Sequence, residues 1–140
     1  MTDYDDVLFA VSFYLLDDDR LGEHGGGLLG ELDGDVRLLS LTVEGESDEQ
    51  RVEHERAFEE FADVLREAGV NVTEELRREA VEDDAVADEI ASEAEDHDLL
   101  VMGHTRVRDD AEPTTAEKVI NTVSVPVVVI PLTAPRFQGH

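Results

Sequence analysis

The chain has 140 residues, the length of one domain with a single hydrophobic core. It carries 36 Asp and Glu residues against 11 Lys and Arg, a formal net charge of −25, which disfavours binding to nucleic acid or anionic membranes. No apolar run is long enough to cross a membrane, and the absence of cysteine excludes disulfides and thiolate chemistry. We therefore expect a cytoplasmic domain without nucleic-acid or membrane partners.

The acidic residues are spread along the whole chain, and Lys118 is the only lysine among the basic residues. An apolar fraction of 41% with clear periodicity favours a folded domain over a disordered acidic segment. Near absence of lysine with retained arginine resembles proteins of halophilic archaea, which implies a salt-rich cytoplasm. At molar salt the screening length falls to about 3 Å, which removes most of the repulsion between carboxylates. An acidic docking face is the alternative interpretation.

The first third of the chain predicts two buried strands around an uncertain crossover segment. Residues 7–11 (VLFAV) and 36–43 (VRLLSLTV) are the strands, and Gly45 closes the second. Between them, residues 17–35 hold four leucines that can share a helical face. They also hold several glycines, each of which weakens a helix by about 1 kcal/mol relative to alanine: Gly22, Gly25, Gly26, Gly27 and Gly30. We therefore expect a first crossover helix that is short, irregular or mobile.

The middle of the chain contains the clearest helix. Ser47 and Gln50 form a capping box at its start, and Gly69 stands where a C-terminal cap is expected. The buried face consists of residues at helical spacing: His54, Ala57, Phe58, Phe61, Ala62, Leu65 and Ala68. Residues 70–76 then alternate as a third strand that is less buried and near an edge of the sheet.

The last third predicts two further helices and two strands. Asp83 or Asp84 caps a helix whose buried face is Val86, Ile90, Ala91 and Ala94. Residues 99–102 form the fourth strand, which ends at Gly103, and residues 126–130 form the fifth. Between them, a capping box of Thr114 and Glu117 starts a helix with a buried face of Ala116, Val119, Ile120 and Val123.

Strands that alternate with helices predict an α/β fold: a single-domain, open, five-stranded parallel sheet with helices on both faces. The crossovers are expected to be right-handed. We assign residues 1–132 to the domain and residues 133–140 to a C-terminal tail. Because open α/β sheets bind ligands at the carboxyl ends of their strands, the end of the fourth strand at Gly103 is the first place to look for a site.

Two segments of the last third resemble one known family. VMGHT and TTAEKVINTVSVPVVVIP are similar to the C-terminal signature of the universal stress protein family, and the earlier strands fall in that family's order. The resemblance implies the five-stranded fold shared by universal stress proteins and adenine nucleotide alpha hydrolases. It also implies a stress-response or regulatory role, homodimers often paired through the last strand, and ATP or AMP as the ligand of many members.

Nucleotide-binding members of that family show the motif G-x2-G-x9-G-[ST] and an Asp just after the first strand. Gly103 matches the first glycine of the motif, but Arg106 takes the place of the second and Pro113 that of the third. Thr114 matches the hydroxyl residue, yet it follows Gly103 by eleven positions where the motif needs fourteen. Proline has no backbone N–H with which to bind phosphate.

Two more departures weaken the predicted nucleotide site. Ser12 stands where the family has its Asp, and the loop carries Asp109, Asp110 and Glu112, which repel phosphate. We therefore predict that ATP binds weakly or not at all, with no firm cofactor. The alternative is that AMP, ATP or another small anion binds at the carboxyl ends of the first and fourth strands. The residues that would line that site are Ser12, Thr42, Gly103, His104, Arg106 and Thr114.

Each of these residues also has a structural explanation. Gly103 could end a strand in a left-handed conformation, and Thr114 could serve only as a helix cap. Arg106, with Arg108, could balance the acidic loop. Ser12 and His104 could be ordinary polar residues at strand ends.

The sequence predicts no catalytic residues and no metal site, because no Ser/His/Asp or Cys/His arrangement, Walker loop or metal-ligand spacing is recognised. Slow nucleotide hydrolysis, with His104 or an acidic loop residue positioning water, is the enzymatic alternative. His54 and His97 are expected to be structural. The last strand, with Val125, Val127 and Val129, is expected to pair two copies of the chain, since an unpaired apolar edge invites aggregation.

Overall fold

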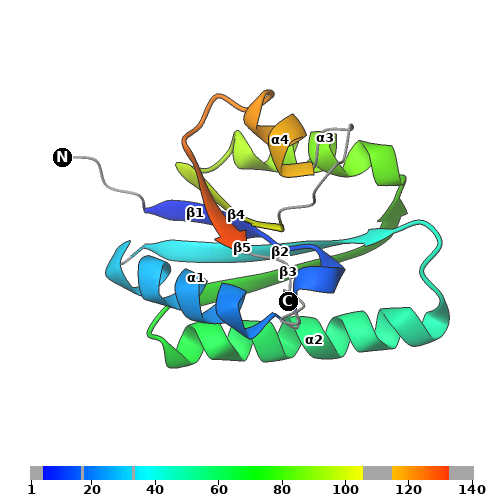
Figure 1. Cartoon of the computed structure of the whole chain (residues 1–140), viewed down its shortest axis with the longest axis horizontal. Coiled ribbons are helices and arrows are strands. Elements are labelled where there is room, and N and C mark those ends of the chain that lie inside the picture. The colour runs from blue at the N-terminus through cyan, green and yellow to red at the C-terminus, as the bar shows by residue number, and fades with distance from the viewer. Residues whose placement is uncertain (1–4, 17, 33, 106–114, 133–140) are drawn as a thin grey trace, which may run out of the picture.

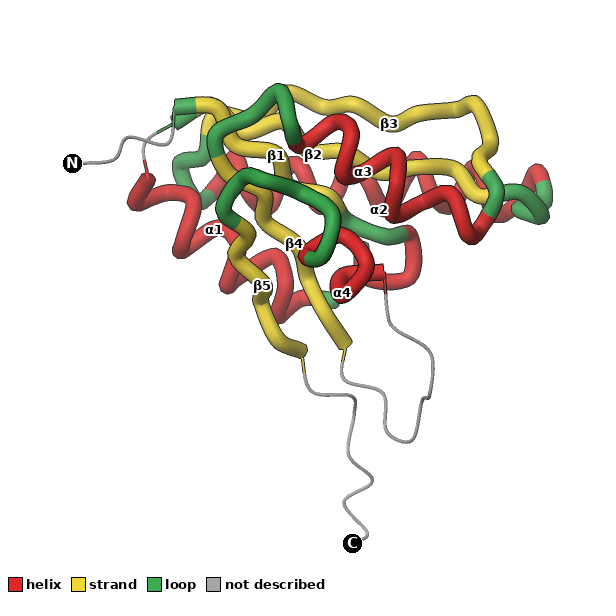
Figure 2. The backbone as a smooth tube through the Cα atoms, turned by 90° about the horizontal axis from the view of Figure 1, so that it is seen from above, coloured by secondary structure: helices red, strands yellow, loops and turns green. Residues whose placement is uncertain are grey.

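A computed structural model describes residues 5–132 of the chain, apart from residues 17, 33 and 106–114. The described chain forms a five-stranded sheet in the order β3-β2-β1-β4-β5, and every neighbouring pair is parallel. The strands are β1 (Asp6–Ala10), β2 (Asp35–Val43), β3 (Asn71–Val81), β4 (Leu99–Thr105) and β5 (Val127–Leu132). The predicted α/β fold with five parallel strands is confirmed, and Figure 2 shows β3 and β5 at opposite edges.

Helices cover both faces of the sheet (Figure 1). On one face lie α1 (Asp19–Leu32) and α2 (Asp48–Glu67), and on the other lie α3 (Val86–Ala94) and α4 (Thr115–Ile120). Alternate residues of β1 enter two separate cores: Val7 and Phe9 face α1 and α2, while Leu8 and Ala10 face α3 and α4. Among the described residues, no helix combines the length and apolar character that a membrane crossing requires.

The first crossover helix differs from the prediction, because α1 is a regular helix of 14 residues. Its glycines are places of close approach. A Cβ added to Gly25 would lie 2.8 Å from Phe9 Cε2, and one added to Gly26 would lie 2.9 Å from the Ala68 Cβ. The expectation of a short or irregular helix was therefore wrong: tight packing on β1 and α2 outweighs the low helix propensity of glycine.

The predictions for α2 are confirmed, except that Ala68, expected on the buried face, is the C-cap residue and is exposed. Ser47 Oγ accepts a hydrogen bond from the backbone N–H of Gln50 at 3.1 Å, and the Gln50 side chain accepts one from the N–H of Ser47 at 2.8 Å. Gly69 has a φ of 91°, as its place after the helix requires. The predicted third strand is also present, as the edge strand β3.

Two details of the later helices were predicted wrongly. Asp83 and Asp84 do not cap α3, because they belong to a short 3-10 turn, η2 (Asp83–Ala85), and Ala85 is the residue before the helix. Ile120 is 46% exposed, whereas Val119 is fully buried. Successive residues of a helix point about 100° apart, so the single turn and a half of α4 buries one of these two side chains only. The predicted cap Thr114 lies outside the described residues.

Candidate functional site

The predicted site lies at the carboxyl end of the sheet, where the strand order reverses. β1 is flanked by β2 on one side and by β4 on the other, so the crossovers on either side of it leave in opposite directions. Ser12 follows β1, Thr42 lies near the end of β2, and Gly103 and His104 belong to β4. Four of the six predicted residues therefore gather at this edge, while Arg106 and Thr114 lie outside the described residues.

Gly103 is covered by aliphatic side chains. A Cβ added to it would lie 3.0 Å from both terminal methyl carbons of Leu21 and 3.4 Å from Leu15 Cδ1. Leu21, in the first turn of α1, is fully buried. The absent side chain of Gly103 thus makes room for α1, and this face of the residue offers no space to a phosphate.

The predicted strand end at Gly103 was also wrong. β4 continues to Thr105, because Gly103, His104 and Thr105 pair with the last residues of β5. Among the described glycines, those with a left-handed backbone are Gly45 and Gly69, so the left-handed explanation for Gly103 does not apply.

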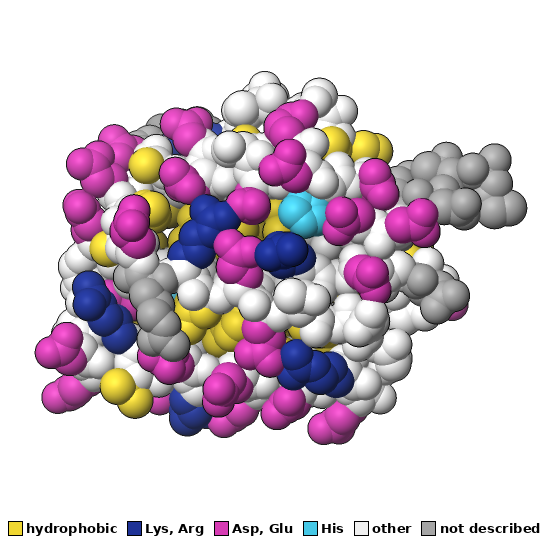
Figure 3. All heavy atoms as spheres, turned by 180° about the vertical axis from the view of Figure 1, so that it is seen from behind, with side chains coloured by type: hydrophobic (Ala, Val, Ile, Leu, Met, Phe, Trp, Pro, Cys, Tyr) yellow, Lys and Arg dark blue, Asp and Glu magenta, His cyan; other side chains and the backbone are white. Residues whose placement is uncertain are grey.

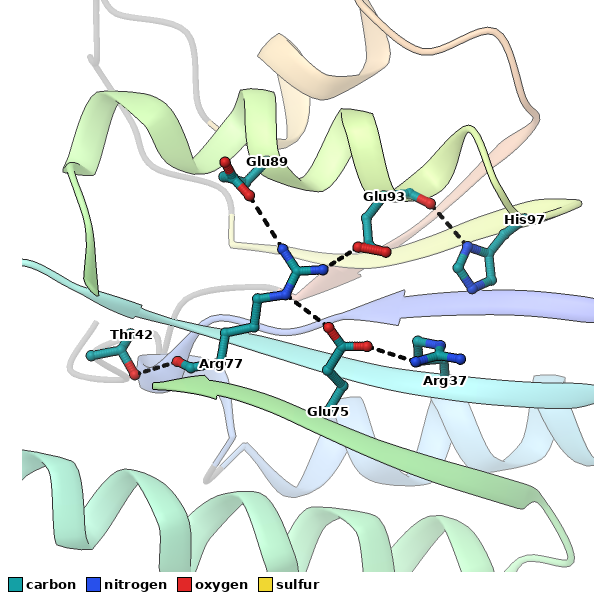
Figure 4. A network of polar contacts seen from close by, with 7 residues as sticks. All are labelled: Arg37, Thr42, Glu75, Arg77, Glu89, Glu93 and His97. Carbon is teal, nitrogen blue, oxygen red and sulfur yellow. Dashed lines mark hydrogen bonds and ion pairs between the residues drawn. The ribbon is translucent and has the colours of Figure 1, made fainter. Parts of the chain in front are cut away.

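Of the two hydroxyl residues of the predicted site, Thr42 bonds elsewhere through its side chain, and Ser12 bonds through its backbone carbonyl. Thr42 is buried, and its hydroxyl donates a hydrogen bond to the backbone carbonyl of Arg77 at 2.7 Å, toward the edge strand (Figure 4). The carbonyl of Ser12 accepts from the N–H of Leu15 at 2.9 Å and so starts a 3-10 turn, η1 (Phe13–Leu15). All buried side-chain polar atoms of the described residues have a hydrogen-bond partner. Of the two hydroxyl residues, Thr42 is therefore committed to the edge strand, while Ser12 contributes its carbonyl to the turn.

A buried polar chain lies beside this edge and was not predicted. His54 Nε2 lies 2.7 Å from Ser40 Oγ, and His54 Nδ1 lies 3.2 Å from Glu46 Oε1. The carboxylate of Glu46 also accepts from the backbone N–H of Val43 at 3.0 Å. Since a carboxylate only accepts, His54 Nδ1 donates to Glu46, and in the neutral ring Nε2 accepts from Ser40. The polar chain ties the start of α2 to the end of β2.

The polar chain has the bonding pattern of a Ser-His-acid triad, but its surroundings are those of a structural core. Ser40 and His54 are each 1% exposed. Ser40 lies within β2, opposite Leu76 of β3, whereas a nucleophilic serine needs an exposed turn and free N–H donors for an oxyanion. The signal in the sequence was a histidine on the apolar face of α2 near a serine in an adjacent apolar strand.

A second polar network joins β3 to α3 (Figure 4). Arg77 pairs with Glu75 at 2.7 Å, with Glu89 at 3.2 Å and with Glu93. Arg37 of β2 approaches Glu75 to 2.6 Å. Burial opposes ionisation of Glu75, but hydrogen bonds from Arg77 and Arg37 outweigh burial and lower the pKa of that carboxyl.

The charges on the surface suit solvation better than anion binding. Figure 3 shows Asp and Glu side chains distributed over this face of the molecule, with the arginines lying among them. The arginines that the structure places in ion pairs with carboxylates are Arg20, Arg37, Arg56, Arg66 and Arg77. Each of these guanidinium groups is engaged by an acidic neighbour, so none supplies a ready phosphate contact. Within the described ranges, no three His, Asp or Glu side chains converge as metal ligands.

Comparison with known proteins agrees with the fold. The model of the universal stress protein family matches residues 4–131. A universal stress protein solved in complex with cAMP superposes with a TM-score of 0.70 at 14% identity, covering 93% of this chain and 98% of that one. The universal stress protein of Archaeoglobus fulgidus superposes with a TM-score of 0.68 at 21% identity, covering 91% and 98%. Its complex with dAMP gives 0.66 at 21% identity, covering 92% and 99%. No curated protein matches the chain.

Proposed function

Because the chain belongs to the universal stress protein family, we propose that it is a cytoplasmic, homodimeric stress-response protein that acts through regulation or protection. In this proposal it binds ATP weakly or not at all. The observation that supports it is the covered face of Gly103, which Leu21 and Leu15 close to a ligand approaching from the α1 side. The loss of glycine at Arg106 and Pro113 points the same way.

The test is a thermal shift measurement in 2 M potassium chloride with millimolar ATP and magnesium. We expect no shift beyond the error of the measurement, because a ligand stabilises only the state it binds. A reproducible shift of several degrees that saturates with ATP would contradict the weak-binding proposal. A denaturation control with magnesium alone separates the metal from the nucleotide.

Dimerisation is proposed through β5. This strand stands at the edge of the sheet, and its sequence VVVIPL is apolar. Val125, Val127 and Val129 are each half-buried in the single chain, so pairing with a second copy would remove more of their surface from water. Light scattering should give twice the chain mass for the wild type and a monomer for Val129→Lys. Val52→Lys, on the exposed face of α2, is the matched control.

A small nucleotide is the second candidate ligand. Structural neighbours have been solved with cAMP, with dAMP and, from Arabidopsis thaliana, with AMP. A ligand with one phosphate needs less of the loop between β4 and α4, which here is three residues shorter than the family motif. Native mass spectrometry of freshly purified protein, followed by a nucleotide panel, tests this. Absence of any bound or acquired nucleotide would remove the candidate.

We propose no catalytic role. The enzymatic alternative, slow nucleotide hydrolysis with His104 or Asp109 positioning water, makes a separate prediction: the His104→Ala, Asp109→Asn double variant would lose whatever hydrolysis the wild type shows. Full retention of a measured rate in that variant would exclude both residues.

A further inference from the structure

The turn η1 spans the carboxyl edge of the sheet and is held on two sides. At one end, the Phe13 ring stacks on the His54 ring of α2, with centroids 4.5 Å apart and planes 11° from parallel. At the other end, Leu15 Cδ1 lies 3.4 Å from where a Cβ of Gly103 would stand in β4. η1 therefore lies over the end of β1, at the point where the strand order reverses.

His54 is a fixed platform for Phe13. Its two ring nitrogens are bonded to Ser40 and Glu46, so the plane of the ring is set by β2 and by the loop that follows it. A flat aromatic face held in this way suits any planar ring. Phe13 itself is half-buried and occupies that face in the closed chain.

The backbone of η1 is held by short-range hydrogen bonds, while Leu15 and Leu16 are buried in the core shared with α1 and α2. The turn is three residues long and depends on the 3-10 hydrogen bonds from Leu15 N–H to the Ser12 carbonyl (2.9 Å) and from Leu16 N–H to the Phe13 carbonyl (3.1 Å). Hydrogen bonds of this type are poorer than those of an α-helix, and short segments of this kind open locally while the rest of a domain stays folded.

We propose that η1 is a built-in cap on the carboxyl-edge site. In the closed state, Phe13 stacks on the His54 ring. In the open state, Phe13 leaves that ring, and a planar heteroaromatic ligand such as adenine can stack on it. This inference rests on the proposed function, and it gives a cause for weak binding within the described residues. The apparent affinity of a ligand is reduced by the fraction of molecules that are open, so removing the cap should strengthen binding.

The first test compares AMP binding in 2 M potassium chloride, by calorimetry, between the wild type, Phe13→Ala and Val72→Ala. Val72 packs on the same apolar core but at the amino end of β3, so it controls for a general loss of packing. We expect Phe13→Ala to bind AMP at least tenfold more tightly than the wild type, and Val72→Ala to bind as the wild type does. An affinity of Phe13→Ala no higher than that of the wild type, including no binding by either, overturns the cap.

The second test needs no variant and no ligand. In hydrogen exchange of the wild type, the amides of Leu15 and Leu16 should exchange at least a hundredfold faster than those of Leu38 and Leu39 in β2, relative to their intrinsic rates. Equal protection would show that η1 opens only with the whole domain and would overturn the proposal even if Phe13→Ala failed to fold. Failure of the proposed function is distinct, because it would appear as tight ATP binding by the wild type.

Discussion

The two faces of the sheet are attached to their helices in different ways. On the α1 and α2 face, glycines bring the helix backbone against Phe9 and Ala68, and His54 is sealed between β2 and η1. On the α3 face, the edge strand β3 is attached through partly exposed ion pairs around Arg77. Contacts of the first kind depend on shape, whereas those of the second kind depend on charge and are screened by salt.

The largest effect expected from salt concerns the whole chain rather than either face. The formal net charge is −25, so the carboxylates of the folded chain repel one another, and molar salt screens that repulsion. We predict that lowering potassium chloride from 2 M to 0.1 M costs several kcal/mol, a large part of the about 5–15 kcal/mol that holds a domain folded. Urea unfolding at the two salt concentrations measures this. Equal stability and equal refolding yield would contradict the halophilic interpretation.

Packing at Gly103 gives the next largest effect. Leu21→Ala should destabilise by about 2–5 kcal/mol, because a fully buried leucine leaves a cavity, and Gly103→Ala by about 1–3 kcal/mol, because its Cβ meets Leu21. In the double variant the smaller residue at position 21 accepts the new methyl group, so the combined loss should be less than the sum.

Urea unfolding of the two single variants and the double variant in 2 M potassium chloride completes this cycle. The coupling should be the same at 1 M and 2 M salt, since no charge is involved. Additive losses would show that Leu21 and Gly103 do not share a packing site, and would remove the main support for a closed site.

The sequence contains enough to predict the sheet and most of the helices. Local periodicity predicts buried strands such as residues 7–11, and capping residues predict the helix that begins at Ser47. Both signals can be seen in short stretches of sequence. What could not be predicted depends on contacts between distant segments. The regularity of α1 depends on the close packing of its glycines against Phe9 and Ala68. The extension of β4 past Gly103 depends on pairing with β5.

The site shows the same limit. The sequence places Ser12, Thr42, Gly103 and His104 at one edge of the sheet, because the carboxyl ends of parallel strands meet there. It does not show that Leu21 would lie on Gly103, or that Thr42 would bond to β3. The partnership of Ser40, His54 and Glu46 was missed because the three residues come from a strand, a helix and the loop between them, with no short motif.

The smallest effect separates the two faces most clearly. Arg77→Met keeps the length of the side chain but removes the charge that Glu75, Glu89 and Glu93 share. Because Arg77 is 30% exposed, we expect a loss of about 1 kcal/mol or less at 0.5 M potassium chloride and a smaller loss at 2 M. His54→Ala, on the other face, should cost more and show no such dependence on salt.

The same variant should change the response to acid. The pKa of Glu75 is lower in the folded chain than in the unfolded chain. At a pH near the ordinary glutamate value, the unfolded chain therefore binds more protons than the folded chain. The free energy of unfolding then falls as the pH falls through the folded-state pKa. Arg77→Met removes one cause of that lowered pKa and should flatten the decline of unfolding free energy below about pH 4.3. Arg51→Met, which removes an exposed arginine of α2, is the control. An acid response of Arg77→Met identical to that of the wild type would mean that the network on the α3 face contributes nothing to stability that depends on its charge.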